Sequence, residues 1–303
     1  MTTYDTIIIG AGPAGLSAAI YLARYRRTVL VIDDHDGRST YPQHNDNYLG
    51  FPEGIDAREL RVLGKKQAKR FDAEFITDTI ESISKKDQLF QIQGKSEAYT
   101  AKTIIFATGV TDILPSFQNA ESYFGHSMFW CIICDGYKAI DKKIVIVGNN
   151  DEAVQTCLQF MNYTKKIEFV TNCVAEQCGI SPEKLKLLEK YAIPCHMATI
   201  IGVEGTDNQL TKMYLNNKKE LTLDLLFNEQ GSHPNSTLAI ALGVEIDSEG
   251  FIKTYEDQRT SMAGVYAAGD VTKIYSHQIT AAVHEGAMAA QAANYDLYPP
   301  DQK

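Results

Sequence analysis

The sequence predicts an α/β protein with two dinucleotide-binding (Rossmann-like) domains, the first of which is discontinuous. Three observations support this fold class. A β-α-β pattern opens the chain, the same pattern returns roughly 137 residues later, and a strand, a glycine turn and an alanine-rich helix close it. A length of 303 residues suits two domains.

The opening pattern begins with the apolar, β-branched run 6–9, which predicts a buried strand. A glycine-rich turn follows at 10–15, and apolar residues then recur at helical spacing as far as Ala23. A second apolar run, 28–32, predicts the next strand and ends at Asp33. This order is typical of the first half of a nucleotide-binding sheet.

The central and final segments complete the predicted topology. The central repeat consists of a strand at 143–147, a turn at Gly148, a helix at 152–161 and a strand at 167–170. The last third has a strand at 264–270 and a helix at 281–293. With linkers expected near Pro115 and Pro234, the sequence predicts a first domain of residues 1–114 and 246–303 and a second of 115–245.

Composition excludes several classes of protein. The chain has 29 Lys and Arg against 38 Asp and Glu, so its formal charge is −9, which disfavours nucleic-acid and anionic-membrane binding. Residues 6–23 are uncharged, but glycines and a proline interrupt them, and the basic residues follow instead of preceding them. We therefore expect no membrane span and a cytoplasmic location.

The turn at residues 10–15 has the pattern G-x-G-x-x-G, formed by Gly10, Gly12 and Gly15, with Pro13 and Ala14 inside it. Such glycines allow a tight turn, close approach of a pyrophosphate and close packing of helix on strand. Asp33 lies near the spacing expected for a carboxylate that binds a ribose hydroxyl. The turn therefore predicts dinucleotide binding.

Six cysteines lie in one central segment: Cys131, Cys134, Cys157, Cys173, Cys178 and Cys195. The pair Cys131 and Cys134 has C-x-x-C spacing, which suits a redox disulfide or a metal site and also arises by coincidence. Zinc normally needs a second pair, and Cys173 with Cys178 keeps a four-cysteine zinc site open. Apart from that alternative we expect no metal site, and we expect the other four cysteines to be buried thiols.

Further motifs extend along the whole chain. They are Asn47 in Asn-Tyr-Leu-Gly-Phe-Pro, Thr108 and Gly109 in Ala-Thr-Gly, Cys131 to Gly136 in Cys-Ile-Ile-Cys-Asp-Gly, Gly269 and Asp270 in Ala-Gly-Asp, and Gln278 and Ile279 in Gln-Ile-Thr-Ala-Ala. In sequence and order these motifs resemble those of low-molecular-weight thioredoxin reductases, which are flavoproteins with two dinucleotide-binding domains. The cysteine motif is the most specific of them.

The resemblance implies an FAD-dependent disulfide oxidoreductase that forms a homodimer and acts on a thioredoxin-like protein or a small disulfide. By the same resemblance, Cys134 lies against the flavin, Cys131 attacks the partner's disulfide, and Asp135 is the acid–base residue. The expected FAD-binding residues are Gly10, Gly12, Pro13, Ala14, Gly15, Asp33, Asn47, Thr108, Gly109, Gly269, Asp270, Gln278 and Ile279.

The sequence departs from that family at the second nucleotide-binding turn. Asn150 stands where the family has the second glycine of this turn. Asp151 and Glu152 follow it, and their presence is explained by helix capping. The stretch 170–176 has no basic residue where the family has a His-Arg-Arg cluster, and His277 replaces an arginine. The loss of two charge-assisted contacts would weaken the binding of NADPH by about 3–6 kcal/mol, or roughly 10²–10⁴ in affinity.

These departures predict that NADPH is not the physiological reductant. They resemble the pyridine-nucleotide-independent branch of the family, whose members take electrons from ferredoxin or carry a second FAD in the vacated site. Three alternatives stay open. One is an ordinary NADPH-dependent thioredoxin reductase, another is an oxidase of a small dithiol metabolite, and the third is a non-catalytic flavin redox sensor.

Overall fold

The structure is a computed structural model that describes residues 2–115, 117–173, 178–272 and 277–303. It divides into two compact units. Unit 1 comprises Met1–Tyr41, Ile55–Thr111 and His233–Lys303, and unit 2 comprises Pro42–Gly54 and Asp112–Ser232. The predicted second boundary at residue 245 lies too far along the chain, because helix α6 (Thr237–Leu242) buries Ala239 in the core of unit 1. The prediction also did not place residues 42–54 with the central unit.

Unit 1 contains a seven-stranded sheet in the order β5-β2-β1-β8-β7-β6, with β19 paired to β8. Its strands are β1 (Thr3–Ile9), β2 (Val29–Asp33), β5 (Glu74–Thr77), β6 (Ile80–Lys86), β7 (Leu89–Gly94), β8 (Ala98–Phe106) and β19 (Val265–Ala267). Strand β1 pairs in parallel with both β2 and β8, so Ile7 lies opposite Leu30 and Ile104. The first half of β8 pairs with antiparallel β7 and its second half with parallel β19.

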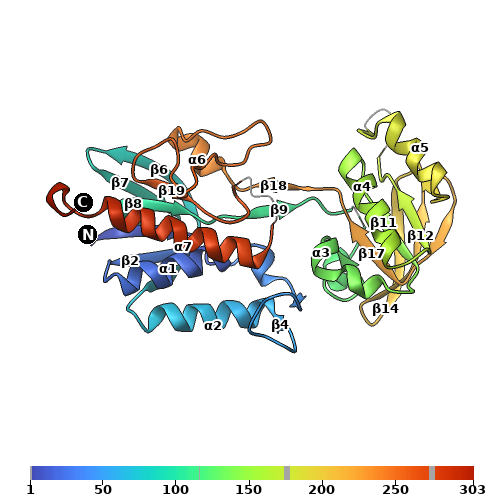
Figure 1. Ribbon diagram of the computed structural model, residues 1–303, viewed down its shortest axis with the longest axis horizontal. Helices are drawn as coiled ribbons and strands as arrows, with labels where there is room; N and C mark the ends of the chain where they lie inside the picture. Colours follow the sequence, from blue (N-terminus) through green and yellow to red (C-terminus); the bar gives the residue numbers. More distant parts are fainter. Residues whose placement is uncertain (1, 116, 174–177, 273–276) are drawn as a thin grey trace. The chain divides into compact units, whose positions relative to one another are not determined.

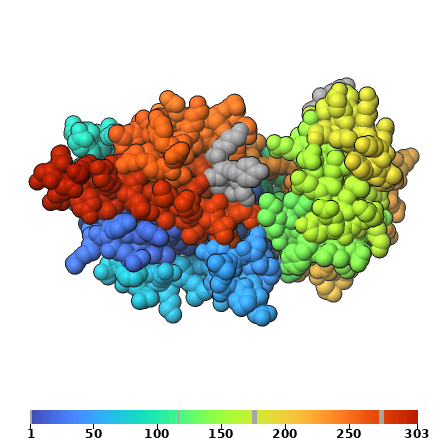
Figure 2. All heavy atoms as spheres, viewed as in Figure 1, coloured from blue at the N-terminus to red at the C-terminus, as the bar shows by residue number. Residues whose placement is uncertain are grey.

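The helices of unit 1 pack on this sheet. They are α1 (Pro13–Arg24), α2 (Ala57–Lys69), α6 and α7 (Ile279–Asp296), with short helices η1 (Arg38–Thr40) and η6 (Pro300–Gln302). Figure 1 shows α1 and α7 side by side on one face of the sheet, and in Figure 2 the red atoms of α7 lie directly against the blue atoms near the N-terminus. Small residues allow this approach, since a Cβ at Gly286 would lie 2.1 Å from the Ala14 carbonyl oxygen.

Unit 2 is built on a five-stranded sheet in the order β10-β17-β11-β12-β13, with a three-stranded antiparallel sheet β14-β15-β16. Its strands are β10 (Met128–Phe129), β11 (Ile144–Val147), β12 (Ile167–Val170), β13 (Cys195–His196), β14 (Ile200–Thr206), β15 (Gln209–Leu215), β16 (Glu220–Thr222) and β17 (Leu225–Asn228). Its helices are α3 (Ile132–Asp135), α4 (Asp151–Gln159), α5 (Pro182–Lys190), η2 (Ala120–Tyr123), η3 (Gly136–Ala139) and η4 (Phe160–Asn162).

Four short strands remain: β3 (His44–Asn45), β4 (Ile55–Asp56), β9 (Val110–Asp112) and β18 (Ser232–Pro234). Strand β3 pairs with β4, and β9 pairs with β18.

The predicted internal repeat is confirmed. The units β1-α1-β2 and β11-α4-β12 each place a helix between two parallel strands, and all four residues of β11 are buried. The uncharged stretch 6–23 forms the end of β1, the glycine turn and most of α1. In the described part of the chain, every helix is too short or too polar to cross a bilayer.

Candidate active site and nucleotide-binding turns

The glycine turn between β1 and α1 leaves room for a ligand at one position only. Gly10 has φ +103° and a Cβ there would lie 2.3 Å from the Ala107 carbonyl oxygen, while a Cβ at Gly15 would lie 2.0 Å from the Gly10 carbonyl oxygen. Gly12 caps α1, and its Cβ would meet only the Ser39 hydroxyl, at 4.0 Å. Pro13 and Ala14 begin the helix, whose first turn has no acidic residue. These residues fit a dinucleotide pyrophosphate.

Asp33 ends β2 and turns its carboxylate back to the glycine turn. Its Oδ1 accepts a hydrogen bond of 2.8 Å from the Ala11 backbone N–H. Its Oδ2 forms an ion pair with Arg61 of α2, and the Arg61 Nε also donates to the Ala11 carbonyl at 3.2 Å. Sequence reasoning missed Arg61, because nothing in the helical pattern of α2 distinguishes it from its other basic residues.

The Ala-Thr-Gly motif ends β8 and is held by Asn235. The Thr108 hydroxyl donates to the Asn235 carbonyl at 2.7 Å, the Asn235 side chain donates to the Thr108 carbonyl at 3.0 Å, and the Asn235 N–H donates to the Gly109 carbonyl. Gly109 has φ +65°, and a Cβ there would meet nothing within 4 Å. The segment around Pro234 and Asn235, expected as a linker, therefore fixes this motif.

Gly269 and Asp270 follow β19 and lie beside a buried carboxylate that sequence reasoning missed. Glu285 of α7 accepts hydrogen bonds from the Gly269 N–H at 2.7 Å and from the Thr272 hydroxyl at 3.1 Å. Burial raises the pKa of Glu285, although these two hydrogen bonds act in the opposite direction. Asp270 itself forms a 2.9 Å ion pair with Arg38. The motif is thus tied to both α7 and η1.

The remaining predicted cofactor residues lie at two places. Gln278 is the N-cap of α7 and Ile279 is its first residue, while the ring of His277 contacts that of Phe251 with centroids 5.8 Å apart. Asn47 belongs to unit 2, whereas the other predicted FAD-binding residues belong to unit 1. Its role at the cofactor stays a prediction.

Cys131 and Cys134 are joined by a disulfide, with their Cα atoms 5.3 Å apart. The helix α3 begins directly after Cys131, whose Sγ accepts a hydrogen bond of 3.1 Å from the Cys134 N–H. Ile133, between them, is 66% exposed, so this turn faces solvent. The pair can therefore exchange with a disulfide outside the chain.

Asp135 directly follows Cys134 and is fully buried. Its Oδ1 accepts a 2.7 Å hydrogen bond from the Lys138 ammonium and its Oδ2 a 3.3 Å bond from the Gln43 amide. Burial raises the pKa of the Asp135 carboxyl above its usual range, while these two donors oppose the rise. A carboxyl with a raised pKa next to a dithiol is suited to accepting and releasing protons.

The second nucleotide-type turn, between β11 and α4, is filled by the chain's own groups. The Asn150 side chain caps α4 by accepting from the Ala153 N–H at 2.9 Å, so Asn150 provides the side-chain cap that the sequence assigned to Asp151 and Glu152. Asp151 instead accepts from the Ser181 N–H at 2.7 Å, and the Asn149 carbonyl accepts from the Gly179 N–H. Of the predicted non-basic stretch 170–176, residues 174–176 lie outside the described residues.

A carboxylate that the sequence did not single out lies at the same turn. Glu229 follows β17, and its N–H donates to the Val147 carbonyl at 2.7 Å. Its Oε1 is enclosed and has no hydrogen-bond partner in the described part of the chain. Burial, and then the negative charge of Glu152, raise the pKa of Glu229 to about 8. The second turn thus has acidic residues at the start of its helix, where the first turn has none.

The four other cysteines are free thiols. Burial raises the pKa of Cys157 and of Cys195, and burial together with a hydrogen bond to Cys173 raises that of Cys178 to about 11. Within the described ranges, His, Cys, Asp and Glu side chains form no group of three or more that could hold a metal ion. The structure therefore gives no support to the four-cysteine zinc alternative.

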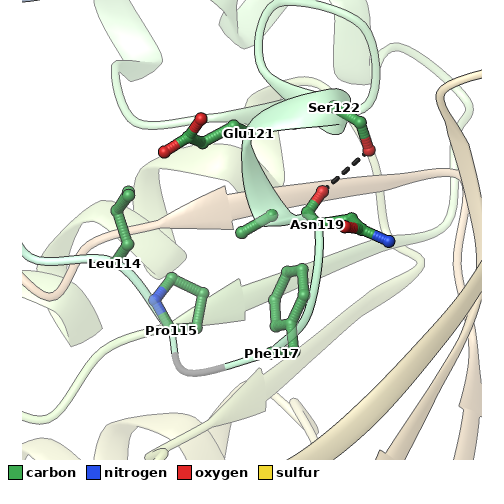
Figure 3. Close-up of a pocket in the computed structure, with 7 residues that line it drawn as sticks. Leu114, Pro115, Phe117, Asn119, Glu121 and Ser122 are labelled. Atoms are coloured by element: carbon green, nitrogen blue, oxygen red, sulfur yellow. Dashed lines mark hydrogen bonds between the residues drawn. The ribbon is translucent and has the colours of Figure 1, made fainter.

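A surface hollow lies in the loop after β9, within unit 2 (Figure 3). It is lined by Leu114, Pro115, Phe117, Asn119, Ala120, Glu121 and Ser122. The Ser122 hydroxyl donates to the Asn119 carbonyl at 2.7 Å, which closes the loop on itself. With Glu121 as its one ionisable lining residue, the hollow offers none of the chemistry of the cysteine pair.

Fold and site together define a class: a disulfide oxidoreductase with two dinucleotide-type domains. The profile of the pyridine nucleotide-disulphide oxidoreductase family matches residues 4–290. A thioredoxin reductase of Treponema pallidum is 32% identical, over 96% of each chain. The crystal structure of thioredoxin reductase from Streptococcus pyogenes superposes with a TM-score of 0.88, at 28% identity, covering 97% of this chain and 98% of its own.

A third relative, NADPH-dependent thioredoxin reductase 3 of Arabidopsis thaliana, is 29% identical over 95% of this chain and 57% of its own length. The chain belongs to the pyridine nucleotide-disulphide oxidoreductase family and, within it, is thioredoxin reductase-like. It is a flavin-dependent disulfide oxidoreductase, and the family implies FAD as its cofactor.

Proposed function

We propose that this enzyme reduces the disulfide of a thioredoxin-like protein or of a small molecule, with electrons that do not come from NADPH. Reduced ferredoxin is the proposed donor. The observation that carries the proposal is the β11–α4 turn, where Asn150 and Asp151 are engaged by the chain itself and Glu229 adds a buried carboxyl group. A nucleotide pyrophosphate would meet the acidic side chains of Asp151 and Glu152 in the first turn of α4, and Glu229 would add repulsion once it ionises.

In the proposed cycle, the Cys131–Cys134 disulfide is reduced to two thiols by two electrons, which FAD would supply when bound, and two protons from solvent. The residues fitted to hold FAD are those of the glycine turn, with Asp33 beside them. The Cys131 thiolate then attacks the substrate disulfide and releases one substrate thiolate. Cys134 resolves the mixed disulfide, which restores the enzyme disulfide and releases the second substrate thiolate.

Proton balance assigns a role to Asp135. The two enzyme thiols lose two protons as the two substrate sulfurs gain two, so the exchange takes up no net proton. We propose that Asp135 carries a proton between these sulfurs, because it follows Cys134 and its carboxyl is buried with a raised pKa. The proposal therefore predicts that Asp135→Asn slows exchange without removing FAD.

The experiment is anaerobic mixing of the FAD-loaded enzyme with NADPH, NADH or reduced ferredoxin, with visible flavin absorbance as the readout. We expect rapid bleaching by ferredoxin, slow or absent bleaching by NADPH, and little by NADH, which lacks the 2′-phosphate but needs the same turn. Rapid bleaching by micromolar NADPH would overturn the proposal. Counting flavins released by acid distinguishes one FAD per chain from two.

The second candidate is an ordinary NADPH-dependent thioredoxin reductase. The observation that favours it is the relative from Arabidopsis thaliana, which is named as NADPH-dependent and matches 95% of this chain. The same experiment decides between them. If NADPH is the reductant, Glu229→Gln and Asn150→Gly will each accelerate bleaching, because the first removes an ionisable group and the second a side chain from an active binding turn.

A further inference from the structure

The buried carboxyl group of Asp135 has a cationic partner that the cysteine motif does not include. Lys138 places its Nζ 2.7 Å from the Asp135 Oδ1, and the side chains are 22% and 1% exposed, respectively. The same Nζ lies 4.8 Å from the centroid of the Phe129 ring. An unpaired carboxylate at such a depth is strongly disfavoured, so this ammonium contributes to keeping it charged.

The local backbone explains the pairing. Gly136 begins the short helix η3, which has three residues per turn, so residues three apart lie on the same side. Lys138 is three residues after Asp135 and therefore faces it. The segment that carries the cysteine pair therefore also contains Lys138, the residue that pairs with Asp135.

Lys138 also connects Asp135 to a second carboxylate nearer the surface. Its Nζ lies 3.9 Å from the Asp46 Oδ2, and Asp46 accepts a 2.5 Å hydrogen bond from the Tyr137 hydroxyl. His44 lies 3.0 Å from the other Asp46 oxygen. Although burial opposes it, the hydrogen bond from Tyr137 and the charges of His44 and Lys138 hold the pKa of Asp46 below its usual range.

Within the described residues of unit 2, these groups, besides the two cysteines, act on Asp135 directly or through Asp46. Lys138 is the cation, Asp46 is a nearby anion, Tyr137 and His44 act through Asp46, and the Gln43 amide is neutral. Lys138 favours the charged form of Asp135, and Asp46 disfavours it. Removing one or the other should therefore have effects of opposite sign.

We propose that Lys138 is a positioning residue for Asp135, which it orients and keeps ionised during thiol–disulfide exchange, and that Asp46 links this pair to the surface. The inference rests on the proposed role of Asp135 as the proton carrier. In the exchange, a Cys131 thiol gives its proton to the Asp135 carboxylate and its sulfur bonds to one sulfur of the substrate disulfide. The other substrate sulfur leaves with the bonding electron pair and takes up the proton.

The test measures the rate at which the reduced holoenzyme releases thiolate from 5,5′-dithiobis(2-nitrobenzoate) between pH 5 and 9. We expect Lys138→Met to move the acid limb of the rate profile to higher pH by about one unit, or about tenfold in rate on that limb. Lys138→Arg should restore the wild-type limb. Asp46→Asn should move it to lower pH, because it removes a charge that repels the ionised carboxyl.

Four possible outcomes distinguish the role of Lys138 from that of Asp135. A Lys138→Met profile that superimposes on wild type, in a protein that melts normally, would overturn the role of Lys138. A Lys138→Arg profile displaced as far as the Lys138→Met profile would also overturn the role of Lys138. If Asp135→Asn leaves the rate unchanged at every pH, the proposed role of Asp135 is wrong. If Asp135→Asn slows exchange but Lys138→Met shifts nothing, only the inference about Lys138 fails.

Discussion

Single carboxyl groups distinguish the two nucleotide turns of this enzyme. At the first turn, the Asp33 side chain is 15% exposed, accepts a hydrogen bond from a backbone N–H and pairs with Arg61. At the second, the Oε1 of Glu229 is enclosed without a partner in the described residues, and the negative charge of Glu152 disfavours ionisation of this carboxyl. Both turns contain acidic residues, and at the first Arg61 balances the charge of Asp33. The acidic side chains around the two turns therefore differ in their partners.

Glu229 should make stability depend on pH. Its pKa is about 8 in the folded protein against an ordinary value of 4.5, so the folded state binds more protons than the unfolded state between these values. Stability associated with this group is therefore complete below pH 4.5 and is lost as pH rises to 8. We expect Glu229→Gln to exceed wild type by a few kcal/mol above pH 8, at about 1.4 kcal/mol per pKa unit, and to match it near pH 4.

Urea unfolding of both proteins at pH 4, 6.5 and 8.5 provides the measurement. Glu152→Gln is the matched control, and it should recover only part of the difference because it removes the lesser of the two causes. An unchanged difference between variant and wild type across this range would contradict the assignment.

At the scale of elements, some glycines of the β1–α1 turn are needed for folding and another for cofactor binding. Gly10 and Gly15 are required by the fold, because a Cβ at either would overlap a backbone carbonyl oxygen at 2.3 or 2.0 Å. Gly12 has no such neighbour and adopts φ −75°, which any residue tolerates. Gly10 and Gly15 are therefore required by the backbone, whereas Gly12 leaves space for a ligand.

Gly12→Val should fold normally and fail to retain FAD, since its branched side chain would enter the space left for the pyrophosphate. Gly10→Ala should instead lower the melting temperature, because both its φ of +103° and the Ala107 carbonyl oppose a side chain. Circular dichroism and flavin absorbance after gel filtration measure the two effects. Wild-type flavin content in Gly12→Val would refute the fit of this turn to a dinucleotide.

At the scale of the whole molecule, the chain concentrates its thiol chemistry at one pair. Cys131 and Cys134 form the disulfide beside exposed Ile133, whereas Cys157 and Cys173 are buried. The pKa of Cys178 is raised to about 11, so little of it is thiolate at neutral pH. The unit that carries the disulfide also supplies residues 42–54, in which Gln43 contacts Asp135 and Asp46 contacts Lys138.

Differential alkylation and peptide mapping should therefore find one reversible disulfide. After treatment with a small disulfide in excess, we expect Cys131 and Cys134 to be oxidised and the other four cysteines to be alkylated at once on unfolding. A Cys131→Ser, Cys134→Ser double variant should retain four free thiols under the same treatment. A disulfide between Cys173 and Cys178 would contradict the assignment of the redox centre.

The sequence by itself determined the fold class, the internal repeat and the cysteine pair. These features depend on local patterns: apolar runs for buried strands, glycines where the backbone must pass closely, and two cysteines one helical turn apart. Strand β12 has the predicted bounds, and the predicted helix at 281–293 lies within α7. The family resemblance added FAD, which the comparisons support.

Only the tertiary structure decided which polar groups meet. Arg61 and Asp33 are 28 residues apart, Gln43 and Asp135 are 92 apart, and Thr108 and Asn235 are 127 apart. No periodicity predicts such pairs, because side chains brought together by chain folding have no fixed spacing in sequence. The same reason explains the misplaced domain boundary, since α6 follows the second linker yet buries its apolar face in unit 1. The spacing of Cys131 and Cys134 in the sequence singled out the pair, whereas tertiary contacts brought the charged residues close to it.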